Sequence, residues 1–467
     1  MKLPDLSAGR APENLGVSPP AAVNYPGARR KLVIVALIFL TALGVRLLNW
    51  QSHRYETLAV QTSVALNYKH QAELIRANGV SSLYDPAAAT NDPDLLGHPP
   101  GYPILLSFIQ RLAPDSDAAT QLLQVVLDSF SVIVIVLIAF EIFPAAIGII
   151  AGFLAAFAPQ FSWNSLTLLP DSLAALPILL ALLLITKTRQ RLNATRLRAL
   201  LSLLAAGALV GVSCWLRANA LLLAPFLTVA LLLIARRGER KRSALILVCG
   251  ALLVVVPLTI RNAVVFGKFI PVSLGAGQTL IEGIADYNTD GSLGLPQTDL
   301  ELIRGEAETA QRPDYANSLF TPDGIARDRA RLARGFAVIR AHPCWFAGVM
   351  LRRAAAMLRL ERTPLRLTTT NTGAGLLQWP LRTVQKLFIT ALFLPLTLSG
   401  AGILVYRRQF PTLAILLAVP GYYFCTQSAL HTEYRYVLVI HYFLFVLAAL
   451  AVYTIATKIN SRLGTVG

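Results

Sequence analysis

Charged residues are scarce in this chain. They make up 14% of its 467 residues, whereas hydrophobic residues make up 55%, and an ordinary soluble domain carries about 25% charged residues. The mean hydropathy is +0.57. This balance excludes the soluble domains that the length alone would suggest, and it excludes a disordered chain. The composition predicts a polytopic membrane protein.

Cysteine and histidine are also few. Four cysteines cannot build a disulfide scaffold in a chain of this length. No HxxxH, CxxC or paired-carboxylate spacing predicts a metal site, and no glycine-rich loop predicts a bound nucleotide. The sequence therefore indicates no cofactor, and it leaves the use of a divalent metal open.

Acidic residues are outnumbered, with 25 Asp and Glu against 42 Lys and Arg and a net charge of +17. In a soluble protein this excess would suggest a nucleic-acid partner. Here the basic residues gather in short clusters beside apolar runs, at 29–31, 187–198, 236–242, 407–408 and 458–462. Short basic loops stay on the cytoplasmic side during insertion. The charge therefore indicates membrane topology, and we expect no nucleic-acid partner.

Ten apolar runs predict membrane-spanning helices. They cover residues 32–50, 119–141, 144–161, 171–186, 199–216, 220–235, 243–260, 384–406, 409–428 and 434–457. The fold class is an all-α polytopic membrane protein with about 10–12 transmembrane helices. Basic flanks place both termini in the cytoplasm. The stretch 101–112 is not expected to cross, because an even number of crossings must separate the outer ends on either side of it.

Four regions follow from this topology. They are a disordered cytoplasmic tail (1–28), an N-terminal transmembrane catalytic module (29–260) that includes a first outer loop (51–118), an extracytoplasmic loop region (261–383) and C-terminal transmembrane helices (384–467). The first outer loop contains an amphipathic helical stretch at about 60–78. The second outer region is expected to be mixed α/β, with a strand-like piece at 264–273 and helices near 326–340 and 344–360.

Ionisable residues at the outer membrane edge are costly, so each is a functional candidate. Asp171 begins a helix, where the dipole favours an anion, and a plain N-cap explains it almost as well. Arg217 and Asn219 lie in a short outer turn, where a snorkelling arginine is the alternative. His98 precedes two prolines and is a candidate contact for substrate. Asp128 lies deeper in its helix and requires a partner.

Arginines on the outer face suit phosphate, because the planar guanidinium gives two parallel charge-assisted hydrogen bonds. Arg261 and Asn262 emerge at the top of a helix. Arg352 and Arg353 lie on a later helix with an apolar face, which is typical of an interfacial helix at anionic headgroups; nonspecific lipid contact also explains them. The helical spacing of the arginines at 327, 331 and 334 is more typical of a solvated face.

Several segments, taken in order, resemble a known group. They are the Tyr68-xxx-Ala72 pattern, LLGHPPGYPILLSF (95–108), LAAFAPQFSWNSLTLLPDSLAAL (154–176), GVSCWLRANALLLAPFL (211–227), TIRNAVVFGKFIPVSLGAGQTLIEG (259–283) and HTEYRY (431–436). The layout resembles the GT-C superfamily of integral-membrane glycosyltransferases, which use polyprenyl-phosphate sugars. Protein O-mannosyltransferases and lipid A aminoarabinose transferases belong to that superfamily.

The resemblance implies a catalytic carboxylate on the first outer loop, a second carboxylate at Asp171 and basic residues that hold the lipid phosphate. Relatives usually carry an acid one helical turn before the tyrosine that corresponds to Tyr68, where this chain has Val64. We therefore assign Glu56, at the exit of the first helix, as the general base. Glu73 and Asp85 are alternative candidates for the base. If none of these acids occupies the site, the protein is an inactive or binding homologue.

Residues and resemblance together predict an inverting glycosyltransferase that moves a sugar from a polyprenyl-phosphate-linked donor to a protein, lipid or glycan acceptor, in contact with membrane lipid. Glu56 and Asp171 are the predicted catalytic residues. The predicted ligands of the substrate or its phosphate are His98, Arg217, Asn219, Arg261, Asn262, Arg352, Arg353 and Arg435. The expected location is the extracytoplasmic face of a bacterial cytoplasmic membrane. The alternative is a transporter, flippase or noncatalytic binder of lipid-linked glycans.

Overall fold

The protein is almost entirely helical. The computed structural model describes residues 27–114, 116–190, 196–234, 238–358 and 391–463. Its α-helices are α1 (Ala28–Leu58), α2 (Thr62–Asn78), α3 (Gly101–Leu112), α4 (Asp117–Ile142), α5 (Ala145–Phe157), α6 (Pro159–Asn164), α7 (Asp171–Gln190), α8 (Arg196–Leu216), α9 (Leu223–Ile234), α10 (Arg240–Phe266), α11 (Ala276–Ala285), α12 (Asp299–Ala310), α13 (Gly324–Ala341), α14 (Pro343–Met357), α16 (Phe393–Tyr406), α17 (Phe410–Thr426) and α18 (Leu438–Leu463). The tail predicted for 1–28 lies, up to residue 26, outside the described residues.

Every predicted spanning run overlaps at least one helix, although the run 144–161 divides between α5 and α6, and residues 384–390 of another run lie outside the described residues. Among the described residues, 6 helices are long and apolar enough to cross a bilayer, namely α1, α4, α7, α8, α10 and the helix that includes α18. The others are shorter: α9 has 12 residues, which span about 18 Å against a hydrocarbon core of about 30 Å. The chain is a multi-pass integral membrane protein, as predicted, and the number of its crossings stays a prediction.

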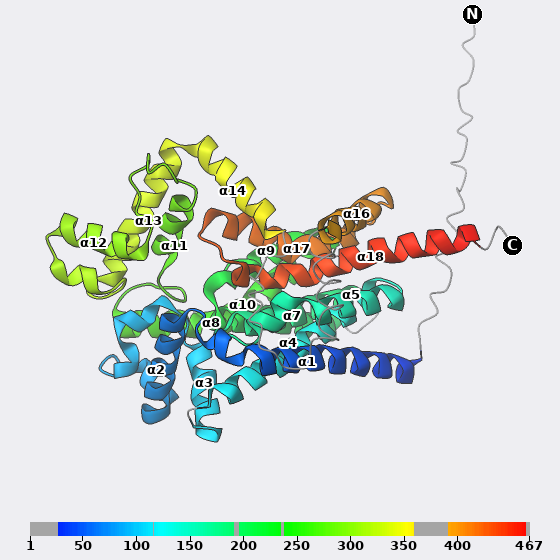
Figure 1. Ribbon diagram of the computed structural model, residues 1–467, viewed down its shortest axis with the longest axis horizontal. Coiled ribbons are helices and arrows are strands. Elements are labelled where there is room, and N and C mark those ends of the chain that lie inside the picture. The colour runs from blue at the N-terminus through cyan, green and yellow to red at the C-terminus, as the bar shows by residue number, and fades with distance from the viewer. Residues whose placement is uncertain (1–26, 115, 191–195, 235–237, 359–390, 464–467) are drawn as a thin grey trace, which may run out of the picture.

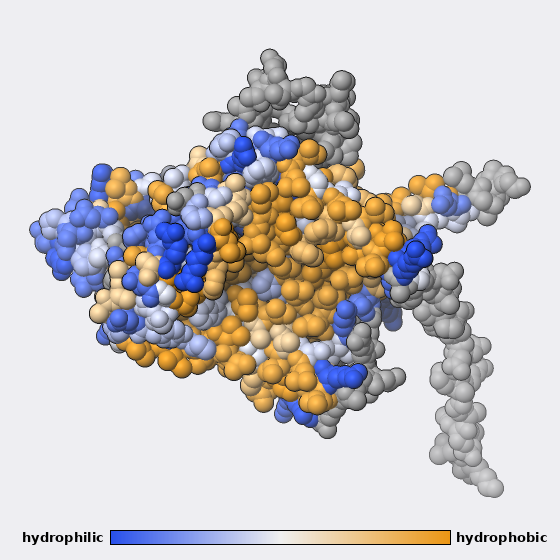
Figure 2. Space-filling model, turned by 90° about the horizontal axis from the view of Figure 1, so that it is seen from below, coloured by the Kyte–Doolittle hydropathy of each residue, from blue (hydrophilic) through white to orange (hydrophobic). Residues whose placement is uncertain are grey.

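The long helices run side by side, and the polar segments gather at one end of the bundle (Figure 1). Helices α2, α3 and α11–α14 lie at that end, whereas the start of α1 and the end of α18 lie at the opposite end. Figure 2 shows hydrophobic residues over the side of the bundle and hydrophilic residues at its two ends. We call the end with α2, α3 and α11–α14 the polar end; that it faces outward stays a prediction.

Helices α7 and α18 form the centre of the bundle. Their apolar windows are 72% and 78% buried, against 17% for α1. The exposed leucines of α1, such as Leu32 and Leu40, therefore lie where lipid would contact them. Surface of this kind is stable only in a bilayer.

The first outer segment has a small core of its own. Tyr68 and Ala72 on α2 pack with Tyr102 and Leu106 on α3. The buried positions of α2 recur at helical spacing, so they form one face, which confirms the predicted amphipathic helix. Helix α3, with 12 residues, lies against α2 and is too short to span a bilayer (about 18 Å).

The second outer region differs from its prediction. The helices expected near 326–340 and 344–360 are α13 and α14. The expected mixed α/β structure is wrong for the described residues, which contain no strand. Helix α10 continues through Phe266 and is followed by Gly267 with φ 62°. The residues beyond it are fixed by a side chain, because the Asn262 amide donates to the carbonyls of Ile270 and Val272, both at 3.0 Å.

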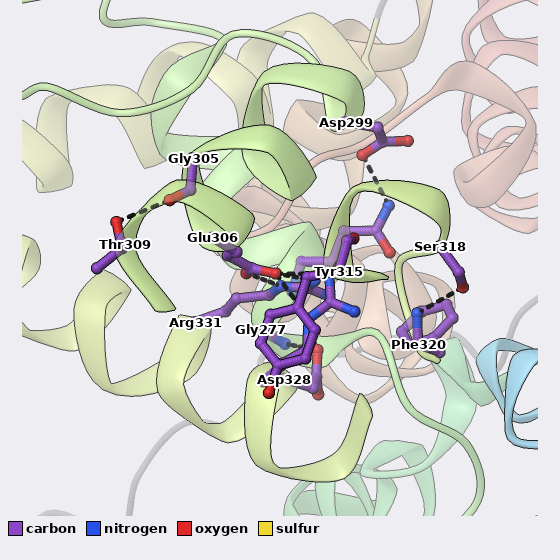
Figure 3. Close-up of polar contacts among 12 residues, drawn as sticks. Gly277, Asp299, Gly305, Glu306, Thr309, Tyr315, Ser318, Phe320, Asp328 and Arg331 are labelled. Atoms are coloured by element: carbon purple, nitrogen blue, oxygen red, sulfur yellow. Dashed lines mark hydrogen bonds and ion pairs between the residues drawn. The ribbon is translucent and has the colours of Figure 1, made fainter. Parts of the chain in front are cut away.

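Helices α11–α14 form a lobe that is held by buried charge. Glu306 on α12 accepts a hydrogen bond from Arg331 Nε of α13 at 2.6 Å (Figure 3). It also accepts one from Arg327 Nε of the same helix at 2.9 Å. Arg327 is 5% exposed and Arg331 is 2% exposed. The expectation that these arginines lie on a solvated face is therefore wrong. Asp328 of the same helix accepts from the backbone N–H of Gly277 at 3.0 Å and so joins α13 to the start of α11.

An ion pair lies inside the bundle. Arg46 Nε of α1 is 2.7 Å from Asp128 Oδ2 of α4, and Tyr442 of α18 donates to Asp128 Oδ1 at 3.0 Å. Arg46 is 0% and Asp128 is 2% exposed. Asp128 therefore has the partner that its depth required, and that partner, Arg46, could not be identified from the sequence.

Candidate functional site

Four segments that are far apart in the sequence meet at the polar end. Asp171 is the first residue of α7 and is buried; its side chain pairs with Arg217, directly after α8, and with Arg435 in the turn before α18. The Arg435 Nη1 to Asp171 Oδ2 distance is 3.6 Å. The fourth segment is the one predicted to form the first outer loop, which contributes Tyr68 and His98. Asp171, Arg217 and Arg435 were predicted from the sequence, and the structure brings them together.

Local structure explains why these side chains point inward. Asp171 lies in the first turn of α7, where backbone N–H groups and the helix dipole favour a carboxylate. Arg217 follows the last turn of α8 in an extended conformation, with φ −155° and ψ 130°. The chain therefore leaves the helix at this residue, and the guanidinium turns towards α7. Asn219, in the next short turn, accepts a hydrogen bond from Tyr422 through its backbone carbonyl at 2.8 Å.

The last turn supplies a second carboxylate. Glu433 accepts two hydrogen bonds from Arg435, at 2.7 and 3.0 Å. The ring of Tyr436 lies beneath both arginines, with its centroid 3.9 Å from Arg217 Cζ and 4.9 Å from that of Arg435. Burial alone would raise the pKa of Glu433, but the hydrogen bonds and charge of Arg435 lower it. Two arginines and two carboxylates leave this group with no formal net charge.

We call Asp171, Arg217, Glu433 and Arg435 the charged cluster. A pocket beside it, with about 290 Å³ of open space, is lined by Asp171, Arg217, Asn219, Arg435 and Tyr436 together with apolar residues of α7 and α18. The arginines can release their carboxylates and bind an anionic group, and the apolar walls continue into the bundle. This combination suits a phosphate that is carried on a lipid chain.

His98 and Tyr68 lie close enough to Arg217 and Arg435 for the charges of both arginines to act on them. Their rings are 4.9 Å apart, and Tyr68 also meets Tyr102 edge-on at 5.1 Å. Burial, together with the positive charges of Arg217 and Arg435, lowers the pKa of His98 to about 3. His98 is therefore neutral at physiological pH. Burial also raises the pKa of Tyr68, which stays a neutral phenol.

Arg261 lies in a neighbouring pocket and not in the charged cluster. Its Nε donates to the Leu83 carbonyl at 2.9 Å and its Nη1 to Asn262 Oδ1 at 2.8 Å, while Nη2 bonds Asn91. Asn262 in turn fixes residues 270–272. These bonds tie the end of α10 to the first outer segment. The predicted role of Arg261 and Asn262 as phosphate ligands stays a prediction.

The other predicted residues lie further away. Glu56 is exposed in the last turn of α1. Arg353 is buried between α14, α11 and the last turn, where it donates to Ser428 O at 2.8 Å and to Gly283 O, whereas Arg352 is exposed. His431 Nδ1 is 2.9 Å from Asp286, which also pairs with Arg353. Arg353 thus joins the lobe to the last turn.

Sequence reasoning missed three residues at this site. Tyr436 and Tyr68 were noted only as parts of motifs, and Gln71 on α2 was not noted at all. The tyrosines had a signal, because each stands in a segment that matched the superfamily pattern. Gln71 had none, since its importance depends on its burial, 4% exposed, and on what it faces.

One family model matches part of the chain. The family model of the dolichyl-phosphate-mannose-protein mannosyltransferases matches residues 97–260, which include His98, Asp171 and Arg217. No protein of curated function matches the chain significantly.

Solved structures share the fold. The archaeal oligosaccharyltransferase AglB from Archaeoglobus fulgidus, in complex with an inhibitory peptide and a dolichol-phosphate, matches with a TM-score of 0.54 and 16% identity over 93% of this chain and 51% of that chain. Its apo form matches with a TM-score of 0.55 and 16% identity, over 94% and 52%. ArnT from Cupriavidus metallidurans bound to undecaprenyl phosphate gives a TM-score of 0.36 at 16% identity, over 91% and 77%, which is too low to establish a shared fold. The chain spans about half the length of the AglB structures. The predicted resemblance to the GT-C superfamily is confirmed.

Proposed function

We propose that this protein is a membrane glycosyltransferase that moves a sugar from a polyprenyl-phosphate-linked donor to an acceptor on the extracytoplasmic face of the membrane. The observation that carries the proposal is the charged cluster, which two arginines and two carboxylates form at the polar end of an apolar bundle. A lipid-borne donor would reach this site from the bilayer with its phosphate at the level of the arginines. The GT-C fold supports the same conclusion.

Arg217 and Arg435 are proposed to bind the donor phosphate. As the bond from the anomeric carbon to the phosphate oxygen breaks, negative charge grows on the departing phosphate, and fixed guanidinium groups stabilise it. The phosphate must compete with Asp171 and Glu433, which hold the arginines in its absence. Asp171 is then proposed to support the acceptor or the base, because it lies next to the phosphate and is released when the phosphate binds.

Glu56 is proposed as the general base. It would take the proton of the acceptor hydroxyl as the oxygen attacks the anomeric carbon from the face opposite the phosphate, which inverts the configuration. Its place at the end of α1 fits an acceptor that arrives from water, because the side chain is exposed. The acceptor type, the sugar type and the bacterial cytoplasmic membrane are part of the same proposal.

The test is sugar transfer or release from a panel of polyprenyl-phosphate hexoses and pentoses, with purified protein in lipid nanodiscs. Glu56→Gln should reduce turnover by about 10²-fold or more, the scale of general-base loss. Glu308→Gln, an equally exposed glutamate on α12, is the matched control and should keep wild-type turnover. Wild-type turnover in Glu56→Gln would remove that residue from the mechanism, and the class of enzyme would stand.

A noncatalytic binder of polyprenyl-phosphate sugars is the second candidate. Val64 favours it, because an apolar side chain that packs on the α2–α3 core stands where the superfamily resemblance leads us to expect an acid. Binding of the donor lipids without turnover of any of them would support this reading over transfer.

A further inference from the structure

A second pocket lies beside the charged cluster, and the proposed mechanism does not use it. It has about 260 Å³ of open space between α2, the loop before α3 and the end of α10. This space is continuous with solvent, so the pocket is an open recess and not a closed cavity. Gln71, His98, Arg261 and Phe266 are among the residues that line it.

Gln71 is the polar group that this pocket leaves unsatisfied. Its side chain is 4% exposed, and it forms no hydrogen bond within the part of the chain that the structure describes. The amide atoms are not fully enclosed by protein, so they are accessible from the pocket. Such a group indicates a ligand with both a hydrogen-bond donor and an acceptor, because an amide offers both.

His98 lines the same pocket and adds a second group of this kind. It makes a ring contact with Tyr68 but no hydrogen bond to any residue that the structure describes. As a neutral imidazole it has one N–H donor and one nitrogen acceptor. It brings no positive charge, so it fits a hydroxyl group better than a phosphate.

The remaining groups of the pocket leave its charge balanced. Arg261 and Asp92, of opposite charge, both line it, and the Arg261 guanidinium already donates to Leu83, Asn262 and Asn91. Phe266 and Val272 add apolar walls. Two neutral amphoteric groups on apolar walls suit an uncharged ring that carries several hydroxyls.

We propose that this second pocket binds the hydroxyl groups of a sugar ring, with Gln71 and His98 as the residues that contact it. The proposal rests on the glycosyltransferase function and names the part of the substrate that this pocket recognises. His98 lines this pocket and lies close enough to Arg217 and Arg435 for their charges to lower its pKa, so a ring held here lies near the proposed phosphate site. The ring belongs either to the donor or to the acceptor.

Binding measurements separate these two sources without requiring turnover. Polyprenyl phosphate, polyprenyl-phosphate hexoses and free methyl hexosides are titrated against protein in nanodiscs. Gln71→Leu keeps the side-chain size and removes the amide. Asn67→Leu, the same change at an exposed position one turn earlier on α2, is the matched control. Thermal unfolding of each variant shows that it is folded.

If the pocket holds the donor sugar, Gln71→Leu weakens binding of the sugar lipid about 10-fold and leaves sugar-free polyprenyl phosphate unchanged. If it holds the acceptor sugar, Gln71→Leu weakens only the methyl hexosides. His98→Phe should behave like Gln71→Leu, and His98→Gln should retain binding. The proposal is overturned if Gln71→Leu and Asn67→Leu behave alike, or if no sugar improves binding to the wild type. If the protein binds sugars in a way that requires Gln71 but turns over no donor, the proposed enzymatic function is refuted and the proposed sugar-binding pocket stands.

Discussion

The intramembrane ion pair gives the sharpest prediction about stability. Arg46 and Asp128 are fully buried and 2.7 Å apart, and Tyr442 holds the second carboxylate oxygen at 3.0 Å. Asp128→Leu or Arg46→Met alone leaves an uncompensated charge inside the bundle. Each single variant should lower the free energy of unfolding by about 3–5 kcal/mol. The double variant should lie near wild type, because the replacement of a buried pair by apolar residues of similar size is often neutral.

The assay is equilibrium unfolding in bicelles, with all three variants and Tyr442→Phe. The tyrosine variant removes one donor to a buried carboxylate and should cost about 1–3 kcal/mol. The reasoning fails if the two single losses add up in the double variant, or if Asp128→Leu costs less than about 1 kcal/mol.

The same variants bear on the transporter alternative. A carrier would need Asp128 as a group that binds substrate or protons at depth. If the pair is structural, the stable double variant keeps donor binding and turnover. A double variant that is folded but binds no donor and has no turnover would show that Asp128 or Arg46 has a functional role.

Two further predictions concern the polar end. At Gly283 an added Cβ would lie 2.4 Å from the backbone N of His431; Gly283→Ala should therefore displace the last turn and lower turnover and donor binding together, and unchanged donor affinity would contradict this contact. For Glu306, burial alone would raise the pKa, but hydrogen bonds and charge from its two arginine partners lower it below the usual 4.5. The unfolded state then binds the proton more readily, so the stabilisation is present above about pH 4.5 and lost as pH falls through the folded pKa. Glu306→Gln should remove that part of the pH dependence of unfolding, and an identical pH profile would refute the assignment.

Much of the fold could be predicted, because a spanning helix is a local property of the sequence. The run at 119–141 and the helix Asp117–Ile142 agree closely, since about 20 apolar residues suffice to define a crossing. The strand expected at 264–273 failed for a long-range reason. Its β-branched residues had strand propensity, but α10 continued through the first of them, and the side chain of Asn262 took the carbonyls that a neighbouring strand would have paired.

The candidate site shows the same division. Asp171, Arg217 and Arg435 could be found singly, because a charge at a membrane edge is visible in the sequence. Their mutual pairing could not, since the three residues stand on segments that only tertiary structure brings together. The ion pairs change the interpretation of the two arginines. An arginine that is already paired with a carboxylate can bind phosphate only if the phosphate displaces that carboxylate.

The contrast between Arg46 and Gln71 extends this point to function. Arg46 carries a full charge in the apolar bundle, and a carboxylate 82 positions away pairs with it, although its Nη2 has no hydrogen-bond partner among the described residues. Gln71 carries no charge and was not predicted, yet its amide lines a pocket and has no hydrogen-bond partner among the described residues. A polar group that is free of protein partners and accessible from a pocket can bind a ligand directly, so Gln71 is a better guide to a ligand than a charge that already has its counter-ion. Charged residues in a membrane sequence identify candidate sites. The hydrogen bonds and ion pairs in the structure then show which candidates have no protein partner and can bind a ligand.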